Sequence, residues 1–78
     1  DDNAMPNVKV YPNPTSSVLY VECEEMVSYV VYNSVGQEVI AGNLNGKLQL
    51  GVGDFGKGVY YLRLSDGVSS KMQKIVVE

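Results

Sequence analysis

Histidine and tryptophan are absent from this sequence, and cysteine occurs once, at Cys23. Without histidine, the chain lacks the commonest general base and the commonest metal ligand. A single cysteine excludes an internal disulfide, so packing alone must stabilise a domain of 78 residues. We expect Cys23 to be a small buried hydrophobe and not a reactive thiol, because it falls on the inward face of an expected strand.

Charge and hydrophobicity exclude two further classes of protein. The net charge is −3 and no cluster of Lys or Arg is present, so nucleic acid is not an expected partner. No apolar run approaches the roughly 20 residues of a membrane-spanning helix. The sequence has neither a signal peptide nor an initiating methionine, and residues 1–6 are polar without periodicity. We therefore expect a linker over 1–6 and one domain over 7–78, cut from the end of a larger protein.

The spacing of turn signals predicts an all-β fold. They recur every ~8–12 residues after the linker, which is typical of a sandwich or barrel, and no helical periodicity is found. We expect an Ig-like or fibronectin-like antiparallel β-sandwich of about seven strands, in which two sheets cover each other. The expected strands are residues 7–11, 18–24, 27–32, 37–41, 47–50, 59–64 and 69–78.

Turns are expected wherever glycine, asparagine or charged pairs interrupt the strands. Asp66-Gly67 is the strongest hairpin signal, and Asn33 to Gly36 is a four-residue turn. Further breaks are expected at Glu24-Glu25 and over residues 42–46, and residues 51–58 form a crossing loop pinned by Phe55. Side chains that alternate along the strands predict an inward face, with Val39 added by its register to the turn. The inward residues are Leu19, Val21, Cys23, Val27, Tyr29, Val31, Val39, Tyr60, Leu62 and Leu64. Val30 and Tyr32 leave the alternation of residues 27–32 ambiguous, and Leu48 and Leu50 share one face of their strand.

No constellation of residues predicts catalysis, a metal site, a cofactor or a small-molecule substrate. Glu22, Glu24 and Glu25 are expected to form a solvated acidic edge. The glycines of residues 51–58 match no phosphate loop, and no run of alternating acids supplies a calcium site. Tyrosines are dispersed over separate strands, and we expect Tyr60 to face inward with its hydroxyl capping a loop. The domain is therefore not expected to be an enzyme.

Three blocks of sequence, taken in order, point to a family. The first is Tyr11 to Thr15 (YPNPT), followed by a strand. The second is Val31 to Val39 (VYNSVGQEV), where the family favours aspartate in place of Asn33. The third runs from Lys57 to Leu64 (KGVYYLRL) and continues through Gly67 to the terminal KIVV. Together they resemble the type A C-terminal sorting domain of type IX secretion in Bacteroidota, and the resemblance covers nearly all of residues 8–78.

This resemblance implies a non-catalytic signal that targets a larger cargo protein to the type IX outer-membrane translocon. The cargo would enter the periplasm through a separate signal peptide. A surface sortase would usually remove the domain by cutting in the linker ahead of it, and the cargo would be released or joined to lipopolysaccharide. The protein is thus expected to be secreted or held at the cell surface, reached through the periplasm and the outer membrane.

The resemblance also implies which residues matter. Recognition would lie in the last two strands and their hairpin, at Gly58, Tyr60, Leu62, Gly67, Lys74, Ile75, Val76 and Val77. Structural motif residues would be Pro12, Asn13, Pro14 and Gly36.

A physical hypothesis accompanies this assignment. A terminal strand with an open edge offers unpaired N–H and C=O groups, to which a partner can add a strand, and residues 71–78 would be read in this way. The alternative function is a fibronectin-like or carbohydrate-binding accessory module of a secreted enzyme. Such a module normally shows a planar row of exposed aromatic side chains, and the absence of Trp argues against it.

Overall fold

The computed structural model of the chain describes residues 8–12 and 14–78, so the expected linker over 1–6 and Asn13 lie outside the described residues. The described part consists of five strands and one short 3₁₀ helix, and it contains no α-helix. The elements are β1 (Val8–Tyr11), β2 (Val18–Tyr32), β3 (Glu38–Gly51), the 3₁₀ helix η2 (Gly53–Phe55), β4 (Gly58–Ser65) and β5 (Ser70–Val77). The all-β expectation is confirmed.

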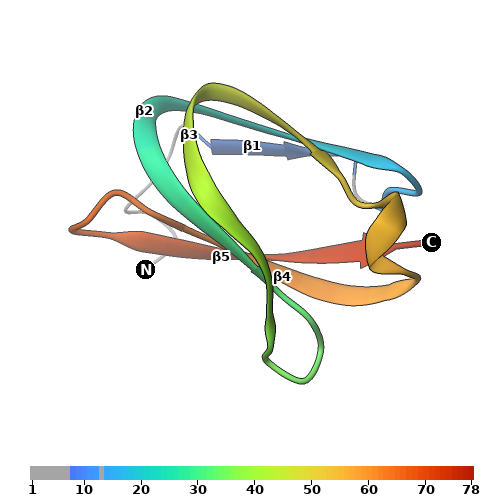
Figure 1. Cartoon of the computed structure of the whole chain (residues 1–78). Coiled ribbons are helices and arrows are strands. Elements are labelled where there is room, and N and C mark those ends of the chain that lie inside the picture. Colours follow the sequence, from blue (N-terminus) through green and yellow to red (C-terminus); the bar gives the residue numbers. More distant parts are fainter. Residues whose placement is uncertain (1–7, 13) are drawn as a thin grey trace.

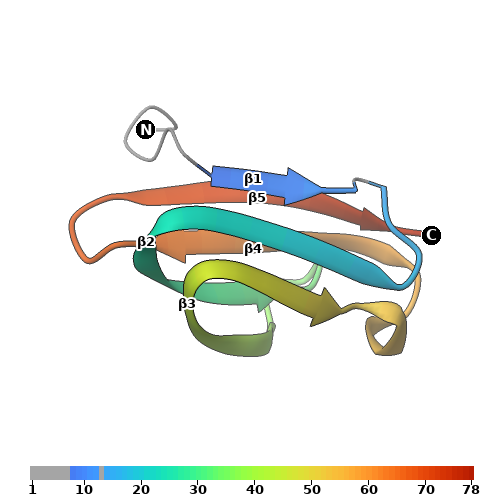
Figure 2. The same ribbon diagram turned by 90° about the horizontal axis from the view of Figure 1, so that it is seen from above.

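All strand pairs are antiparallel and belong to one sheet. The order is β1-β2-β4-β5, with β3 also paired to β2. The long strand β2 makes this possible, because its first half pairs with β1 and its second half pairs with β4. The sheet curls over on itself, so that β1 and the first half of β2 face β5 and β4 across the interior (Figures 1 and 2).

The expected count of seven strands is wrong, because two of the expected breaks lie within continuous strands. β2 runs through Glu24 and Glu25, where its pairing with β3 shifts register between Cys23 and Met26. β3 runs through the glycine-rich residues 42–46, where Gly46 has a positive φ of 93°. A bulge bends a strand and increases its twist without ending it. The acidic pair and the glycine therefore mark the bend between the two layers of one sheet.

Alternation of side chains places the core between these layers. The inward faces expected for β2 and β4 are confirmed, and Leu50 and Leu44 of β3 are buried with them, while Leu48 is half-buried against the core. Val39 is a correction, since its side chain is 39% exposed. The cause is a second register shift: Val31 pairs with Ile40 and Tyr32 pairs with Glu38, which leaves Val39 without a cross-strand partner.

The expected turns at Asn33 to Gly36 and at Asp66-Gly67 are confirmed. Gly36 has a φ of 89°, and its N–H donates to the Asn33 carbonyl at 3.0 Å. The Asn33 side-chain oxygen also accepts from the N–H of Gln37 at 2.9 Å. Glycine occupies position 36 because this φ is strained for residues that carry a Cβ. The expected crossing loop contains η2, and the Phe55 side chain packs against the core as expected.

Candidate recognition surface

The β4–β5 hairpin brings together the residues that the sequence singled out for recognition. Gly58 lies opposite Val77 in the register of the two strands, and Tyr60 lies opposite Ile75. Cross-strand partners share one face of a sheet. The two strands of the third block therefore form one continuous structure.

Half of these residues face the core. The side chains of Tyr60, Leu62, Ile75 and Val77 are all buried, and Leu62 has no solvent exposure. A partner that binds the folded domain cannot touch them. They hold β4 and β5 against the rest of the sheet, so their contribution to any signal acts through the fold.

The other half lies nearer the solvent. Gly58, Gly67 and Lys74 are exposed, and Val76 is half-buried. Gly58 and Gly67 have φ values of 150° and 95°, within the range that favours glycine. Gly58 therefore serves the backbone path at the start of β4 and Gly67 serves it in the hairpin turn, so among these four residues Lys74 and Val76 are the ones that carry side chains.

Tyr60 combines a buried ring with a polar tip. Its hydroxyl donates to the Gly56 carbonyl at 2.9 Å and also lies in hydrogen-bonding distance of the Phe55 carbonyl. The rings of Tyr60 and Phe55 are in contact, with centroids 5.5 Å apart. The expected loop cap is confirmed, and it ties η2 to the start of β4.

The tip of the hairpin is fixed by the side chain of Asp66. Its Oδ1 accepts from the N–H of Ser69 at 2.7 Å and from the N–H of Val68 at 2.8 Å. These two bonds, of which the one from Ser69 has the larger effect, lower the pKa of Asp66 because they favour its charged form. Val68 itself is 95% exposed, so the tip presents an apolar side chain on an ordered turn.

The sequence did not predict a clamp between Thr15 and the end of β5. The Thr15 N–H donates to the Val76 carbonyl at 2.9 Å, and the Glu78 N–H donates to the Thr15 carbonyl at 2.8 Å. The buried Thr15 hydroxyl donates to the Val18 carbonyl at 2.6 Å. The hypothesis of an open edge along residues 71–78 is therefore wrong at Val76 and Glu78, since Thr15 already pairs with them in parallel orientation.

The clamp at Thr15 lies directly after the two prolines of the first sequence block. Pro12 and Pro14 are exposed, and Asn13 lies outside the described residues. Thr15 directly follows Pro14 and contacts the end of β5 through its backbone. A signal for this contact was present in the sequence, since a threonine directly follows the second proline, but spacing alone does not show which strand it meets.

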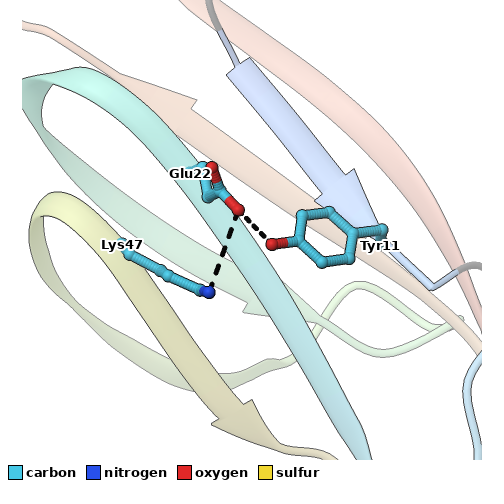
Figure 3. A network of polar contacts seen from close by, with 3 residues as sticks. All are labelled: Tyr11, Glu22 and Lys47. Atoms are coloured by element: carbon cyan, nitrogen blue, oxygen red, sulfur yellow. Dashed lines mark hydrogen bonds and ion pairs between the residues drawn. The ribbon is translucent and has the colours of Figure 1, made fainter.

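A polar and aromatic cluster joins β1, β2 and β3 on the other layer (Figure 3). The Tyr11 hydroxyl donates to the Glu22 carboxylate, and Lys47 lies 4.0 Å from the same carboxylate. The hydrogen bond to Glu22 raises the pKa of Tyr11. The Tyr11 and Tyr20 rings stack with centroids 5.5 Å apart, and Lys47 lies over the Tyr20 ring. Glu22, expected on a solvated acidic edge, therefore has two specific partners.

The described part of the chain offers neither a metal site nor a membrane-spanning helix. No three His, Cys, Asp or Glu side chains lie close enough there to hold a metal ion. No helix in residues 8–12 and 14–78 has the length and apolar character needed to cross a membrane.

Comparison with protein families shows to which family the chain belongs. Residues 9–78 match the family model described as the secretion system C-terminal sorting domain. The chain belongs to this family. The match includes all three blocks from which the resemblance was drawn, together with Thr15 and β5. No curated protein matches the chain.

The function of the domain follows from the family to which it belongs. It is a C-terminal signal of type IX secretion and is non-catalytic, which implies export of the protein that carries it to the cell surface or beyond. The accessory module named as the alternative is not favoured by this match. The sequence-based assignment of family and function is confirmed.

Proposed function

We propose that the type IX outer-membrane translocon reads this sorting domain as a folded unit after its cargo has reached the periplasm. A surface sortase then removes the domain, and the cargo is released or joined to lipopolysaccharide. The observation that supports this proposal is the family match over residues 9–78, which contains the whole β4–β5 hairpin.

The predicted recognition residues divide into two roles in this proposal. Tyr60, Leu62, Ile75 and Val77 are buried and act by keeping β4 and β5 in place. Lys74 and Val76 offer side chains on the other side of the same strands, and Gly58 and Gly67 shape their ends. The sortase is proposed to cut within or before residues 1–6, ahead of the domain.

The proposal is tested by fusing residues 1–78 behind a reporter enzyme that carries a signal peptide, in a bacterium that has type IX secretion. We expect the reporter outside the cell, and a fusion without the sorting domain retained in the periplasm. A reporter that stays in the periplasm with a folded, protease-resistant sorting domain would contradict the proposal.

Deletion of residues 74–78 is a weaker test of this proposal. The deletion removes Ile75 and Val77 from the core and breaks the contacts with Thr15, so loss of export would accompany unfolding. Circular dichroism of the truncated domain identifies this case. Point variants of exposed residues, which leave the core intact, are the sharper probe.

A further inference from the structure

The outer face of β4 and β5, with the adjoining second half of β2, forms a continuous surface opposite the core. We name as the outer face the six side chains that alternate with the buried ones and lie opposite one another in register. These are Val30 and Tyr32 of β2, Tyr61 and Arg63 of β4, and Met72 and Lys74 of β5.

The register makes these residues neighbours. Arg63 lies between Val30 and Met72, and Tyr61 lies between Tyr32 and Lys74. Residues directly opposite on antiparallel strands have Cβ atoms about 4.5–5.5 Å apart, so their side chains form a continuous patch. Tyr61, on the central strand β4, is 37% exposed, and Met72, on the neighbouring β5, is 51% exposed, so both present apolar surface to solvent.

The chemistry of the patch favours a protein partner. Tyrosine, methionine and arginine are enriched at the centres of protein interfaces. Isolated cations without an apolar centre would instead suit a phosphate or a lipid headgroup.

Charge complementarity indicates the sign of that partner. The outer face carries two of the six basic residues of the chain, Arg63 and Lys74, and none of its six residues is acidic. Arg63 is exposed and has no ion-pair partner within the described ranges. A positive, partly apolar face on an otherwise acidic domain steers association toward a negative surface.

We propose that the outer face is the docking surface for an outer-membrane protein of the secretion machinery, which presents an apolar recess bordered by carboxylates. This inference rests on the proposed function and deepens it. Recognition then uses side chains that project from the face of the sheet, and it differs from strand addition at the edge of β5, part of which Thr15 already occupies.

The reporter fusion described above tests this surface through Arg63→Glu and Arg63→Gln. We expect export to fall roughly tenfold for Arg63→Glu and less for Arg63→Gln, because reversal adds repulsion to the loss of attraction. Lys9→Glu is the matched control, since Lys9 is an exposed cation on β1 in the other layer. We expect its export to equal that of the unmodified fusion.

Each outcome bears on one of the two proposals. An unmodified fusion that is not exported overturns the proposed function and this inference with it. An unmodified fusion that is exported, together with equal export of Arg63→Glu, overturns the inference alone. Circular dichroism of the 78-residue chain shows whether Arg63→Glu is folded, and Met72→Ser provides a second variant in which no charge changes.

Cross-linking identifies the class of partner. A photo-reactive amino acid replaces Met72 in the exported fusion, and a second fusion carries it at Lys9. We expect a cross-link from position 72 to one outer-membrane protein, absent from position 9 and lost when Arg63→Glu is combined with it. A ladder of lipopolysaccharide adducts, a dimer of the fusion, or no cross-link from position 72 would overturn the inference.

Discussion

On the inner face of β4 and β5, Leu62 and Ile75 are almost completely buried, whereas Tyr61 and Met72 on the outer face are 37% and 51% exposed. The two sets come from the same strands, because successive side chains of a strand point to opposite faces. A run of consecutive family-motif residues therefore mixes positions that make the fold with positions that a partner can touch. Loss of export alone therefore does not identify a recognition residue.

The largest expected effect on stability is that of Leu62→Ala, on the inner face of β4. Removal of a buried leucine side chain costs about 2–5 kcal/mol, and a small domain has a total stability of only about 5–15 kcal/mol. We expect a large fall in the urea midpoint, followed by circular dichroism, and loss of export through unfolding.

Arg63→Ala is the matched control on the outer face, one residue further along β4. A substitution at an exposed position usually changes stability by no more than about 0.5 kcal/mol. If Arg63→Ala lowered stability as much as Leu62→Ala, the division between the two faces would be wrong.

The inner face extends into β3, where Gly42→Ala is the next largest effect. A Cβ at Gly42 would lie 2.8 Å from the hydroxyl oxygen of the buried Tyr29 and 3.0 Å from its ring. The ring must shift within a packed core, which typically costs about 1–3 kcal/mol. Urea denaturation of the variant measures the cost.

Gly51→Ala supplies the control in the same strand. A Cβ there meets no atom within 4 Å, and Gly51 does not have a positive φ. We expect neutral or slightly raised stability, since alanine reduces the entropy of the unfolded chain. Equal stabilities of the two alanine variants would show that Tyr29 does not constrain Gly42.

A smaller effect on stability is expected at Thr15, whose backbone pairs with the end of β5. Thr15→Val keeps the size of the side chain but removes the hydroxyl donor to the Val18 carbonyl. Loss of one buried hydrogen bond costs about 1–2 kcal/mol. We also expect faster hydrogen exchange of the Glu78 amide, which donates to the Thr15 carbonyl.

Thr15→Ser is the corresponding control, because it retains the hydroxyl and loses only a methyl group. The Glu78 amide should keep its protection in this variant. A serine variant that exchanges as fast as the valine variant would show that the hydroxyl is not what fixes the clamp.

Alternation allowed the inner faces of β2 and β4 to be predicted from sequence, because a period of two is a local property of a strand. Leu19, Val31 and Leu64 all lie where this period places them. The turn at Gly36 and the hairpin at Gly67 were also predictable, since both need a positive φ that glycine adopts at least cost.

The features that were missed depend on contacts between distant segments. Glu24-Glu25 and Gly46 have the composition of turns, but β2 and β3 stay paired on both sides of the bulge, at Cys23 with Gly46 and at Met26 with Asn45. The inward placement of Val39 failed because a register shift in the partner strand cannot be seen from one strand. The clamp by Thr15 likewise joins residues whose separation along the chain carries no periodic signal.

The outer face could be outlined from sequence only in part. The family resemblance drew attention to β4 and β5, and alternation separates Tyr61 and Arg63 from the buried residues between them. Val30 and Tyr32 join the face through the pairing of β2 with β4, which is a tertiary feature. The sequence therefore indicated the strands of the candidate site, whereas the lateral extent of the site required the structure.

The smallest expected effect concerns Asp66, in the turn that joins β4 to β5. The pKa of Asp66 is lowered from 3.8 in the folded domain, chiefly by the hydrogen bond from the Ser69 N–H. A lowered folded pKa means that the charged carboxylate stabilises the domain above pH 3.8, and that this contribution is lost as the pH falls through the folded pKa. Asp66→Asn keeps an oxygen acceptor but does not titrate, so the free energy of unfolding should fall less between about pH 5 and about pH 2.

Urea titrations over this pH range measure the difference, with Asp54→Asn as the control for removing one exposed carboxylate. Superimposable curves for the two variants would contradict a specific role for Asp66. Export should change little in Asp66→Asn at neutral pH, because the amide oxygen can still hold the turn that presents Val68. The substitution removes the charge of the Asp66 carboxylate and leaves both faces of the hairpin unchanged. A large loss of export with an intact fold would therefore mean that the recognised surface includes this charge as well as the outer face.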